Sequence, residues 1–492
     1  MVNKKSFKTY NMITNLLLIP IIGSLLILII DENSYKGAER IKKFGIFFAL
    51  INFLISIIIW GEFDSSSLQY QFIQEYNHSI FCHFHVGIDG ISIYFILLTT
   101  FITPICLLSN WYSIFTKVKT FVIAFLLIET LLIGVFVVLD LILFYIFFEA
   151  VLIPIFLVVG IYGSSSTRIR AAFLLFLYTL AGSLFILLAI LDIYNKLGTT
   201  DYTLLYFGNI EFSHQKLLWL AFFLSFAVKT PLFPFHIWLP RAHAEAPLRG
   251  SVLLAGLFLK LATYGYLRIL LNFIPEATSY FSPLIQTIAI ITLIYSSLAT
   301  IRQFDMKAIV AYSSISHMAI VILGLFSNTL VGIEGAILLS IAHGFISPAL
   351  FILLGGVLYD RFHSRILRYY RGLRSRIPIF RLLFFIATIC NIGVPLSLNW
   401  AGEFISLIGI FQQSPIIRIF ASSSIVLSAC YSIFLFNRIS FGKLGNYTYL
   451  PSDINKREYI ILLTLLFPRV LFGIIPNIIL NDLHASVTQL LY

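Results

Sequence analysis

The chain has 492 residues, of which 59% are hydrophobic and only 11% are charged. Soluble globular domains carry roughly 25% charged residues, so this composition excludes a water-soluble globule, and an aromatic content of 16% excludes a disordered chain. The remaining class is an integral membrane protein. The net charge of +11 comes mostly from Lys and Arg between apolar stretches, which indicates orientation in a membrane rather than nucleic-acid binding.

The apolar stretches, taken in chain order, predict an all-α polytopic membrane protein. About 20 apolar residues cross a hydrocarbon layer, so the chain holds about 14 transmembrane helices. Their expected limits are 11–30, 44–60, 89–111, 118–138, 141–160, 171–192, 217–233, 250–272, 281–300, 308–327, 331–358, 382–411, 416–436 and 458–480. We expect three N-terminal helices in 1–117, one half in 118–272, a second half in 281–441, and a C-terminal loop with the last helix in 442–492.

Basic residues alternate between the two sets of connecting segments. The segment 62–87 and the turns near 272–280 and 412–415 contain no Lys or Arg, whereas the segment 361–381 is rich in Arg. Because positively charged loops stay on the inner side of a membrane, this alternation supports the number of helices. It predicts that both termini lie on the positive-poor side.

Two of the expected helices are predicted to break at membrane depth. Pro231 follows Lys229 in one of them, and Pro395 precedes Glu403 in the other. Proline removes a backbone donor and clashes with the preceding turn, so each helix should break there. When helices 4–8 and 9–13 are grouped as two units, each broken helix is the fourth of its five. We therefore expect two inverted five-helix repeats whose breaks mark a transport site.

Ionisable residues interrupt several of the apolar stretches, where a charge costs about 2.5–3.5 kcal/mol to insert. They are Glu129, Glu149, Lys229, Lys260, His317, His343 and Glu403. Any one of them could be a packing residue that a neighbouring carbonyl or hydroxyl satisfies. As a set, they spread acids, bases and imidazoles over different helices, which favours a proton relay.

A specific order of transfer follows from the two breaks. Glu149 and Lys229 fall in the same half and could pair, which would hold the lysine charged until the two separate. Lys260, His317 and His343 would pass the proton sideways, and Glu403 would release it to the positive-poor side.

The sequence contains no motif for a bound cofactor. It has no phosphate-binding loop, no dinucleotide fingerprint and no closely spaced metal ligands. Its cysteines, Cys82, Cys106, Cys390 and Cys430, form no C-x-x-C pair. We expect no cofactor, no metal and no redox catalysis on this chain, so that energy comes from an ion gradient or from a partner protein.

Five motifs resemble the antiporter-like subunits of respiratory complex I. They are Gly-Ile-Asp-Gly-Ile-Ser at 87–92, Phe-Phe-Glu-Ala at 147–150, Phe-His-Ile-Trp-Leu-Pro-Arg-Ala-His-Ala-Glu-Ala-Pro at 235–247, Ala-Tyr-Ser-Ser-Ile-Ser-His-Met at 311–318 and Asn-Trp-Ala-Gly-Glu-Phe at 399–404. The resemblance extends from about residue 87 to about residue 410, and the stretch 235–247 is its most specific part.

The resemblance implies a proton-translocating subunit of NADH:quinone oxidoreductase that is driven by quinone reduction elsewhere in the complex. It implies roles in the proton path for six of the ionisable residues named above: Glu149, Lys229, Lys260, His317, His343 and Glu403. The resemblance supports such a role less strongly for Glu129. Family members similar to subunits 2 and 5 carry Lys where this chain has Glu403.

The resemblance also implies the partners and the location. The expected partners are other membrane-arm subunits of complex I, especially the two neighbouring antiporter-like ones similar to subunits 2 and 5, together with lipids and without nucleic acid. The expected location is the mitochondrial inner membrane, with a bacterial plasma membrane as the alternative.

Two other functions remain open from the sequence. A subunit of a multisubunit cation/proton antiporter would share these motifs, and co-purification with an NADH-oxidising arm would separate it from a complex I subunit. A haem-bearing oxidase subunit would use His317 and His343 as axial ligands and would show a Soret band.

Overall fold

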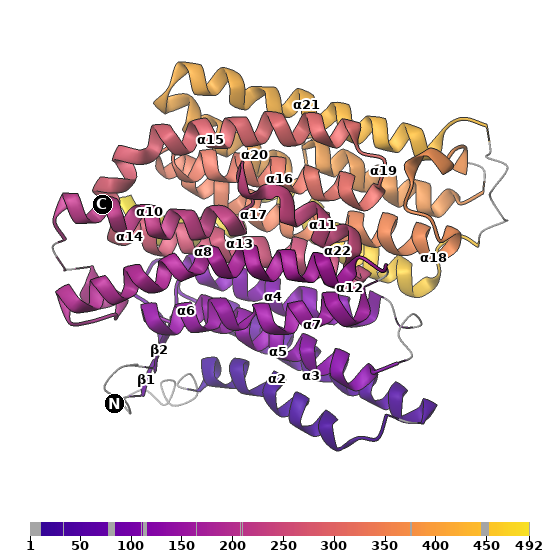
Figure 1. Ribbon diagram of the computed structural model, residues 1–492, viewed down its shortest axis with the longest axis horizontal. Helices are drawn as coiled ribbons and strands as arrows, with labels where there is room; N and C mark the ends of the chain where they lie inside the picture. The colour runs from indigo at the N-terminus through magenta and orange to yellow at the C-terminus, as the bar shows by residue number, and fades with distance from the viewer. Residues whose placement is uncertain are drawn as a thin grey trace.

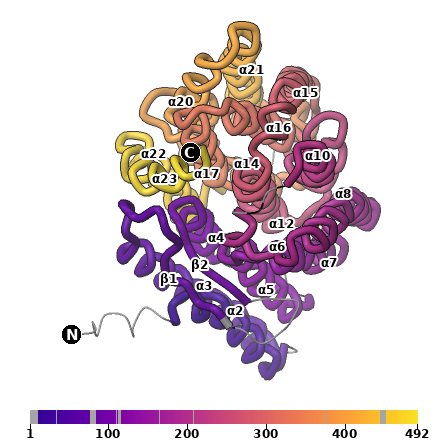
Figure 2. The backbone as a smooth tube through the Cα atoms, turned by 90° about the vertical axis from the view of Figure 1, so that its left-hand side faces the viewer, coloured from indigo at the N-terminus to yellow at the C-terminus, as the bar shows by residue number. Residues whose placement is uncertain are grey.

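The computed structural model describes residues 11–491 except 33, 77–83, 110, 112–115, 164, 207, 209, 374–375 and 444–451, so Cys82 lies outside the described residues. Long helices run side by side along one direction (Figure 1). Seen end-on, helices α2 and α3 lie at one edge of the bundle and α21 lies at the opposite edge (Figure 2). This arrangement confirms the prediction of an all-α polytopic membrane protein in its coarse form.

The first part of the chain holds α2 (Met12–Ile29), α3 (Tyr35–Glu62), α4 (Gly90–Ser109), α5 (Val118–Val137), α6 (Leu141–Ala150), α7 (Leu152–Tyr162) and α8 (Arg168–Leu197). The middle part holds α9 (Tyr202–Leu205), α10 (Phe212–Lys229), the 3-10 turn η1 (Phe235–Ile237), α11 (Trp238–Glu245), α12 (Leu248–Leu253), the π turn η2 (Leu254–Phe258), α13 (Leu259–Gly265), the π turn η3 (Tyr266–Leu270), α14 (Leu271–Phe273) and α15 (Pro275–Arg302).

The last part holds α16 (Met306–Leu325), α17 (Leu330–Phe351), the π turn η4 (Ile352–Leu358), α18 (Tyr359–Phe362), the 3-10 turn η5 (Leu367–Tyr369), α19 (Pro378–Ile392), α20 (Leu398–Gln413), α21 (Pro415–Ser440), α22 (Lys456–Ile474) and α23 (Asn477–Leu491). Helices α17 and α20 pack against each other over much of their length.

In the described part of the chain, 11 helices are long and apolar enough to cross a membrane, or up to 12 if the bent pair α22–α23 is one span. The expected number was about 14. The difference arises largely where helices break, because α10 ends at Lys229 and α19 has only 15 residues before its own break. The last expected span, 458–480, is also interrupted, since α22 ends at Ile474 and α23 turns away from it by 72°.

A β-hairpin occupies part of the segment 62–87, which the sequence analysis treated as a loop. Strand β1 (Gln71–Tyr76) pairs antiparallel with β2 (Phe84–Ile88), and Gln74 lies opposite Val86. Val86 also bridges Val138 at the end of α5. The hairpin lies at one end of the bundle and α18, where the Arg-rich segment begins, lies at the other end (Figure 1). Helix α23 lies at the same end as the hairpin, which faces the viewer in Figure 2.

Both predicted proline breaks are present. After α10 ends at Lys229, the next helical turn begins at Phe235. Helix α19 ends at Ile392, and Gly393 follows with a φ of +82°. Glycine is the residue that most easily adopts this left-handed conformation, and it commonly terminates helices. Ser397 then caps α20 by accepting a hydrogen bond from the backbone N–H of Trp400.

Candidate functional site

Six of the seven predicted residues meet in three contact pairs. The pairs are Glu149 with Lys229, Lys260 with His343, and His317 with Glu403. All except Glu149 are at most 5% exposed, and the Glu149 side chain is 15% exposed. Buried charges are retained only when partners compensate for lost hydration, so the geometry of each pair decides what it can do.

The first pair forms where two helices end. Lys229 is the last residue of α10, and its Nζ lies 3.6 Å from Oε1 of Glu149, the penultimate residue of α6. The same Nζ donates a 2.9 Å hydrogen bond to the carbonyl of Phe148 and lies 3.0 Å from the centroid of its ring. A carboxylate, a carbonyl and an aromatic face therefore hold the ammonium together.

The second pair lies in an irregular helix. Lys260 follows the π turn η2, and its Nζ donates a 2.6 Å hydrogen bond to the carbonyl of Ala255 within that turn. The same Nζ lies 2.8 Å from Nδ1 of His343 on α17. Single π turns are rare and frequently occur at functional sites. The contact lets a proton be shared between an amine and an imidazole.

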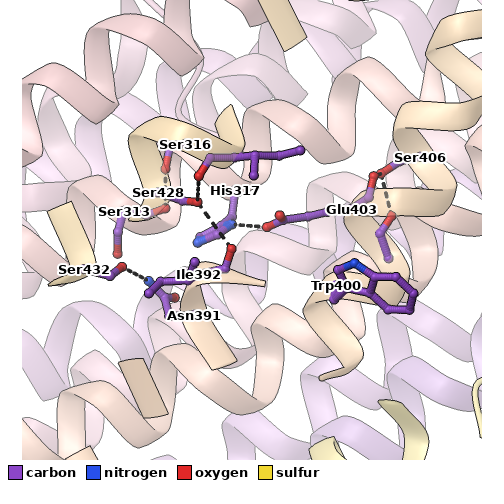
Figure 3. A network of polar contacts seen from close by, with 12 residues as sticks. Ser313, Ser316, His317, Asn391, Ile392, Trp400, Glu403, Ser406, Ser428 and Ser432 are labelled. Atoms are coloured by element: carbon purple, nitrogen blue, oxygen red, sulfur yellow. Dashed lines mark hydrogen bonds and ion pairs between the residues drawn. The ribbon is translucent and has the colours of Figure 1, made fainter. Parts of the chain in front are cut away.

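The third pair lies beside the second break. His317 on α16 and Glu403 on α20 point toward each other, with Nδ1 3.0 Å from Oε1 (Figure 3). A Cβ at Gly393 would lie 2.9 Å from Oε2 of Glu403. The glycine that ends α19 therefore also makes room for the carboxylate. The other imidazole nitrogen, Nε2 of His317, lies 3.3 Å from the hydroxyl of Tyr431.

The pairs adjoin one another. The rings of His317 and His343 have centroids 5.9 Å apart, which links the second pair to the third. Phe258, two residues before Lys260, has its ring centroid 5.4 Å from Nζ of Lys229, which brings the first pair against the helix of the second. The three pairs thus form one row, which we call the buried row, from the first break to the second.

Glu129 stands apart from the buried row. It is fully buried on α5, and its Oε1 accepts a 2.8 Å hydrogen bond from the Asn52 amide on α3. In the described part of the chain, no hydrogen bond or ion pair connects Glu129 to any of the other six residues.

Several neighbours of the row are not recognisable from the sequence. Tyr431 and Phe148 contact it directly, yet an aromatic residue in an apolar helix carries no signal that separates a site from packing. Lys307 reads as a residue of a connecting segment, but it is 3% exposed and its Nζ donates a 2.9 Å hydrogen bond to the carbonyl of Ala246.

Two further histidines lie near the first break but do not share a site. His243 is fully buried and stacks on Phe351, with ring centroids 4.7 Å apart. His236 lies against Tyr295 instead, with ring centroids 5.2 Å apart. Among the described residues, no group of three or more His, Cys, Asp or Glu side chains could hold a metal ion.

The fold and the buried row define a class: a polytopic protein with ionisable residues at two helix breaks, which is the arrangement of ion transporters. Residues 138–465 match the family described as NADH:quinone oxidoreductase/Mrp antiporter, transmembrane. NADH-ubiquinone oxidoreductase chain 4 of Mycosarcoma maydis is 62% identical over 481 residues, which cover 98% of this chain and 99% of that protein. The same chain of Marchantia polymorpha is 46% identical over 484 residues, covering 98% and 97%.

Solved structures agree with this match. A chain of respiratory complex I from Thermus thermophilus with bound NADH has a TM-score of 0.87 and 28% identity, and the match covers 98% of this chain and 100% of that one. A chain of an archaeal membrane-bound sulfane sulfur reductase has a TM-score of 0.86 at 20% identity, which shows a likeness of fold alone. The present chain belongs to the NADH-ubiquinone oxidoreductase chain 4 family, the antiporter-like membrane subunits of complex I.

Proposed function

We propose that this chain moves protons across the membrane as the antiporter-like subunit of complex I, along the buried row from Glu149 to Glu403. The observation that carries the proposal is the arrangement of the row itself. Acids, amines and imidazoles contact one another in pairs, away from lipid, between two broken helices. Such intramembrane ionisable residues characteristically form proton relays.

Separation of the first pair is the step that releases a proton. A buried ammonium is stable beside a carboxylate and costly without one, so moving Glu149 away from Lys229 favours the neutral amine. At their 3.6 Å contact the pair attracts by about 5 kcal/mol for an effective dielectric constant near 20. Moving one proton against 100 mV costs about 2.3 kcal/mol, so the change is of sufficient size.

The released proton then moves along the remaining pairs. Lys260 and His343 share it, and the neighbouring imidazole of His317 passes it to Glu403. Glu403, beside the second break, exchanges with the positive-poor side. In this scheme Glu129 acts outside the row, and no cofactor or metal on this chain takes part.

Membership of complex I makes the other complex I subunits the partners of this chain. We assign the two neighbouring antiporter-like subunits, similar to subunits 2 and 5, as the direct ones. Quinone reduction elsewhere in the complex supplies the energy. Lipids surround the exposed apolar helices, and no nucleic acid binds.

The multi-pass chain is assigned to the mitochondrial inner membrane. The relatives from Mycosarcoma maydis and Marchantia polymorpha favour this over a bacterial plasma membrane. Because the hairpin and α23 lie opposite the Arg-rich segment, we place both termini on the intermembrane-space side. We assign 14 spans by adding α10, the broken pair α19–α20 and the bent pair α22–α23 to the 11 long apolar helices, and we assign inverted halves to 118–272 and 281–441.

The two rival functions are less well supported. The family description covers cation/proton antiporters as well, but the full-length identity of 62% is to a complex I chain. The match to the family of NADH:quinone oxidoreductase and Mrp antiporter subunits lends no support to a haem-bearing oxidase subunit.

The test is proton pumping by complex I in sealed vesicles with Glu149→Gln. The substitution removes the negative charge that holds Lys229, so pumping and coupled NADH:quinone activity should fall about tenfold or more. NADH–ferricyanide activity of the hydrophilic arm should not change. Asp192→Asn, at an exposed carboxylate on α8 paired with Lys196, is the matched control. Normal pumping by both Glu149→Gln and Lys229→Met would refute the assigned path.

A further inference from the structure

A fully buried arginine lies beside the second break and belongs to none of the three pairs of the buried row. Arg469 is on α22, within an apolar helix, and is 0% exposed. A guanidinium is charged at all relevant pH values and carries five N–H donors. Burying such a group is costly unless partners compensate for the lost hydration. The neighbours of Arg469 therefore indicate what its charge does.

One N–H group fixes Arg469 to the end of α19. Its Nη2 donates a hydrogen bond to the carbonyl of Cys390, in the last turn of that helix. One turn further along α22, a Cβ added to Gly473 would lie 2.6 Å from the backbone nitrogen of Leu398, so α22 packs closely on the segment between α19 and α20. The last carbonyls of a helix lack partners within the helix and attract cations. This contact therefore stabilises the break itself.

The other donors of Arg469 are not used in this way. Its Nε and Nη1 are buried and have no hydrogen-bond partner among the described residues. The carboxylate whose charge acts on the guanidinium is that of Glu403. A Cβ at Gly393 would lie 2.9 Å from Oε2 of Glu403, and Cys390, which Arg469 binds, is three residues before this glycine. The cation and the carboxylate therefore both adjoin the end of α19.

The direct partner of Glu403 cannot by itself supply a permanent positive charge. Oε1 of Glu403 lies 3.0 Å from Nδ1 of His317 (Figure 3). An imidazole compensates for the charge of a carboxylate only while the imidazole is protonated. If His317 were the sole counter-charge, the ion pair would retain the proton that the row has to pass on. A permanent cation nearby removes this conflict, because His317 can then be neutral while Glu403 is ionised.

We propose that Arg469 is a positioning residue of the proton path: a permanent counter-charge that keeps Glu403 ionised beside a neutral His317, ready to accept the next proton. This inference rests on the proposed function, in which Glu403 is the last member of the buried row. Arg469 releases no proton itself, since a guanidinium stays charged. Among the described residues the ion-pair contact of Glu403 is with His317, so Arg469 acts from beyond direct contact, by an attraction that falls only inversely with distance.

The first test separates the charge of Arg469 from its hydrogen bond to Cys390. Arg469→Gln keeps an N–H donor but removes the charge, whereas Arg469→Lys keeps the charge. In intact complex I in sealed vesicles, Arg469→Gln should lower the initial rate of proton pumping about tenfold, and Arg469→Lys should retain most of the rate. Arg302→Gln, which removes an exposed cation at the end of α15, is the matched control. Normal pumping by Arg469→Gln, or equal losses in Arg469→Gln and Arg469→Lys, would overturn the proposal.

The second test does not depend on pumping. It measures the temperature at which half of the detergent-solubilised complex dissociates, followed on native gels. Arg469→Gln and Glu403→Gln should each lower this temperature, because each leaves one buried charge without its counterpart. Glu403→Gln/Arg469→Gln removes both charges and should lower it by less than the sum of the two single effects.

The outcomes of the second test separate this inference from the proposed function. Additive effects would overturn the pairing of the two charges. If a single variant fails to assemble, recovery of assembly in Glu403→Gln/Arg469→Gln supports the pairing, and no recovery contradicts it. Non-additive effects together with normal pumping by Glu403→Gln would support the pairing but overturn the assigned exit, and with it the role of Arg469 in the proton path.

Discussion

Tyr431 shows how a neutral residue can tune the buried row. Its hydroxyl lies 3.3 Å from Nε2 of His317 and 3.3 Å from Oγ of Ser316, so it can receive a proton from one and donate to the other. The opposite nitrogen of the same imidazole faces Glu403. The tautomer of His317 is therefore set from both sides of the ring.

We expect Tyr431→Phe to slow proton pumping without abolishing it. The lost hydrogen bond is worth about 1 kcal/mol, which corresponds to a fall of about fivefold in the rate of coupled pumping. Initial rates of acidification in vesicles measure this effect. Tyr178→Phe, on the partly exposed face of α8, is the control. A rate equal to that of the unaltered complex would show that the hydroxyl plays no part in transfer.

At the residue scale, the residues of the row could be predicted from the sequence, because charges within apolar stretches are costly and therefore rare. The contact between Glu149 and Lys229 was expected only as a possibility, and the structure shows it at 3.6 Å. Tyr431 and Phe148 could not be found in this way, since their type is common in apolar helices and only tertiary packing brings them to the row.

Each broken helix places its ionisable residue at a helix end. The break after α10 leaves Lys229 as the last helical residue, and the break after α19 leaves room for Glu403 beside Gly393. These breaks were predictable because a second helix-breaking residue accompanies each proline: Pro234 follows Pro231, and Gly393 precedes Pro395. Single prolines, such as Pro104 in α4 and Pro348 in α17, lie inside continuous helices. The hairpin β1–β2 was not predictable from the sequence, since its strands are short and its pairing depends on contacts with the end of α5.

Gly393→Ala should disturb the second break in two ways. Its φ of +82° costs a residue with a Cβ about 1–2 kcal/mol, and the new Cβ would lie 2.9 Å from Oε2 of Glu403. The carboxylate must then move relative to His317. We expect a lower temperature of unfolding together with reduced proton pumping, measured on the same preparation. Gly61→Ala, where nothing lies within 4 Å of the added Cβ, is the matched control, and equal behaviour of the two variants would contradict this role.

An ion pair between His85 on β2 and Asp201, the residue before α9, holds the hairpin. The 2.7 Å hydrogen bond that Nδ1 of His85 donates to Oδ2 of Asp201 raises the pKa of His85 above 6.5. Burial alone would raise the pKa of Asp201, but hydrogen bonds from His85 and Thr203 outweigh it, so the pKa falls below 3.8. Both shifts mean that the pair stabilises the folded hairpin.

The pH dependence follows from the signs of these shifts. The contribution of His85 is fully present below pH 6.5 and is lost as the pH rises through its raised folded pKa. The contribution of Asp201 to the stability of the hairpin is present above pH 3.8 and is lost as the pH falls through its lowered folded pKa. Hydrogen exchange of β2 should therefore speed up on going from pH 6 to pH 9, beyond the intrinsic pH effect. In His85→Gln this extra change should vanish, and its persistence would assign the pH effect to another group.

At the scale of the whole molecule, two fully buried helices carry the middle of the buried row. The helix that carries Lys260, Leu248–Phe273, is fully buried, as is Leu330–Phe362, which carries His343. These two helices occupy the centre of the bundle, and the N-terminal and C-terminal helices cover them (Figure 2). Lys260 and His343 are therefore shielded from lipid, whereas the Glu149 side chain in the first pair is 15% exposed.

The overall architecture was predictable from the sequence to the level of class, because apolar length and charge alternation are set by the membrane. The bend of 72° between α22 and α23 was not predicted, since the apolar stretch 458–480 continues through Pro476. The order of contacts within the row also required the structure, because residues as distant as Lys260 and His343 come together only through packing.

Lys260 is the residue that joins the two halves of the row, so its replacement tests the account most directly. The measurement is the number of protons pumped per NADH oxidised by complex I with Lys260→Met in sealed vesicles. A continuous relay predicts that this ratio falls, together with coupled activity, while NADH–ferricyanide activity stays normal. An unchanged ratio would mean that protons cross the membrane without passing Lys260, and it would contradict the assignment of the buried row.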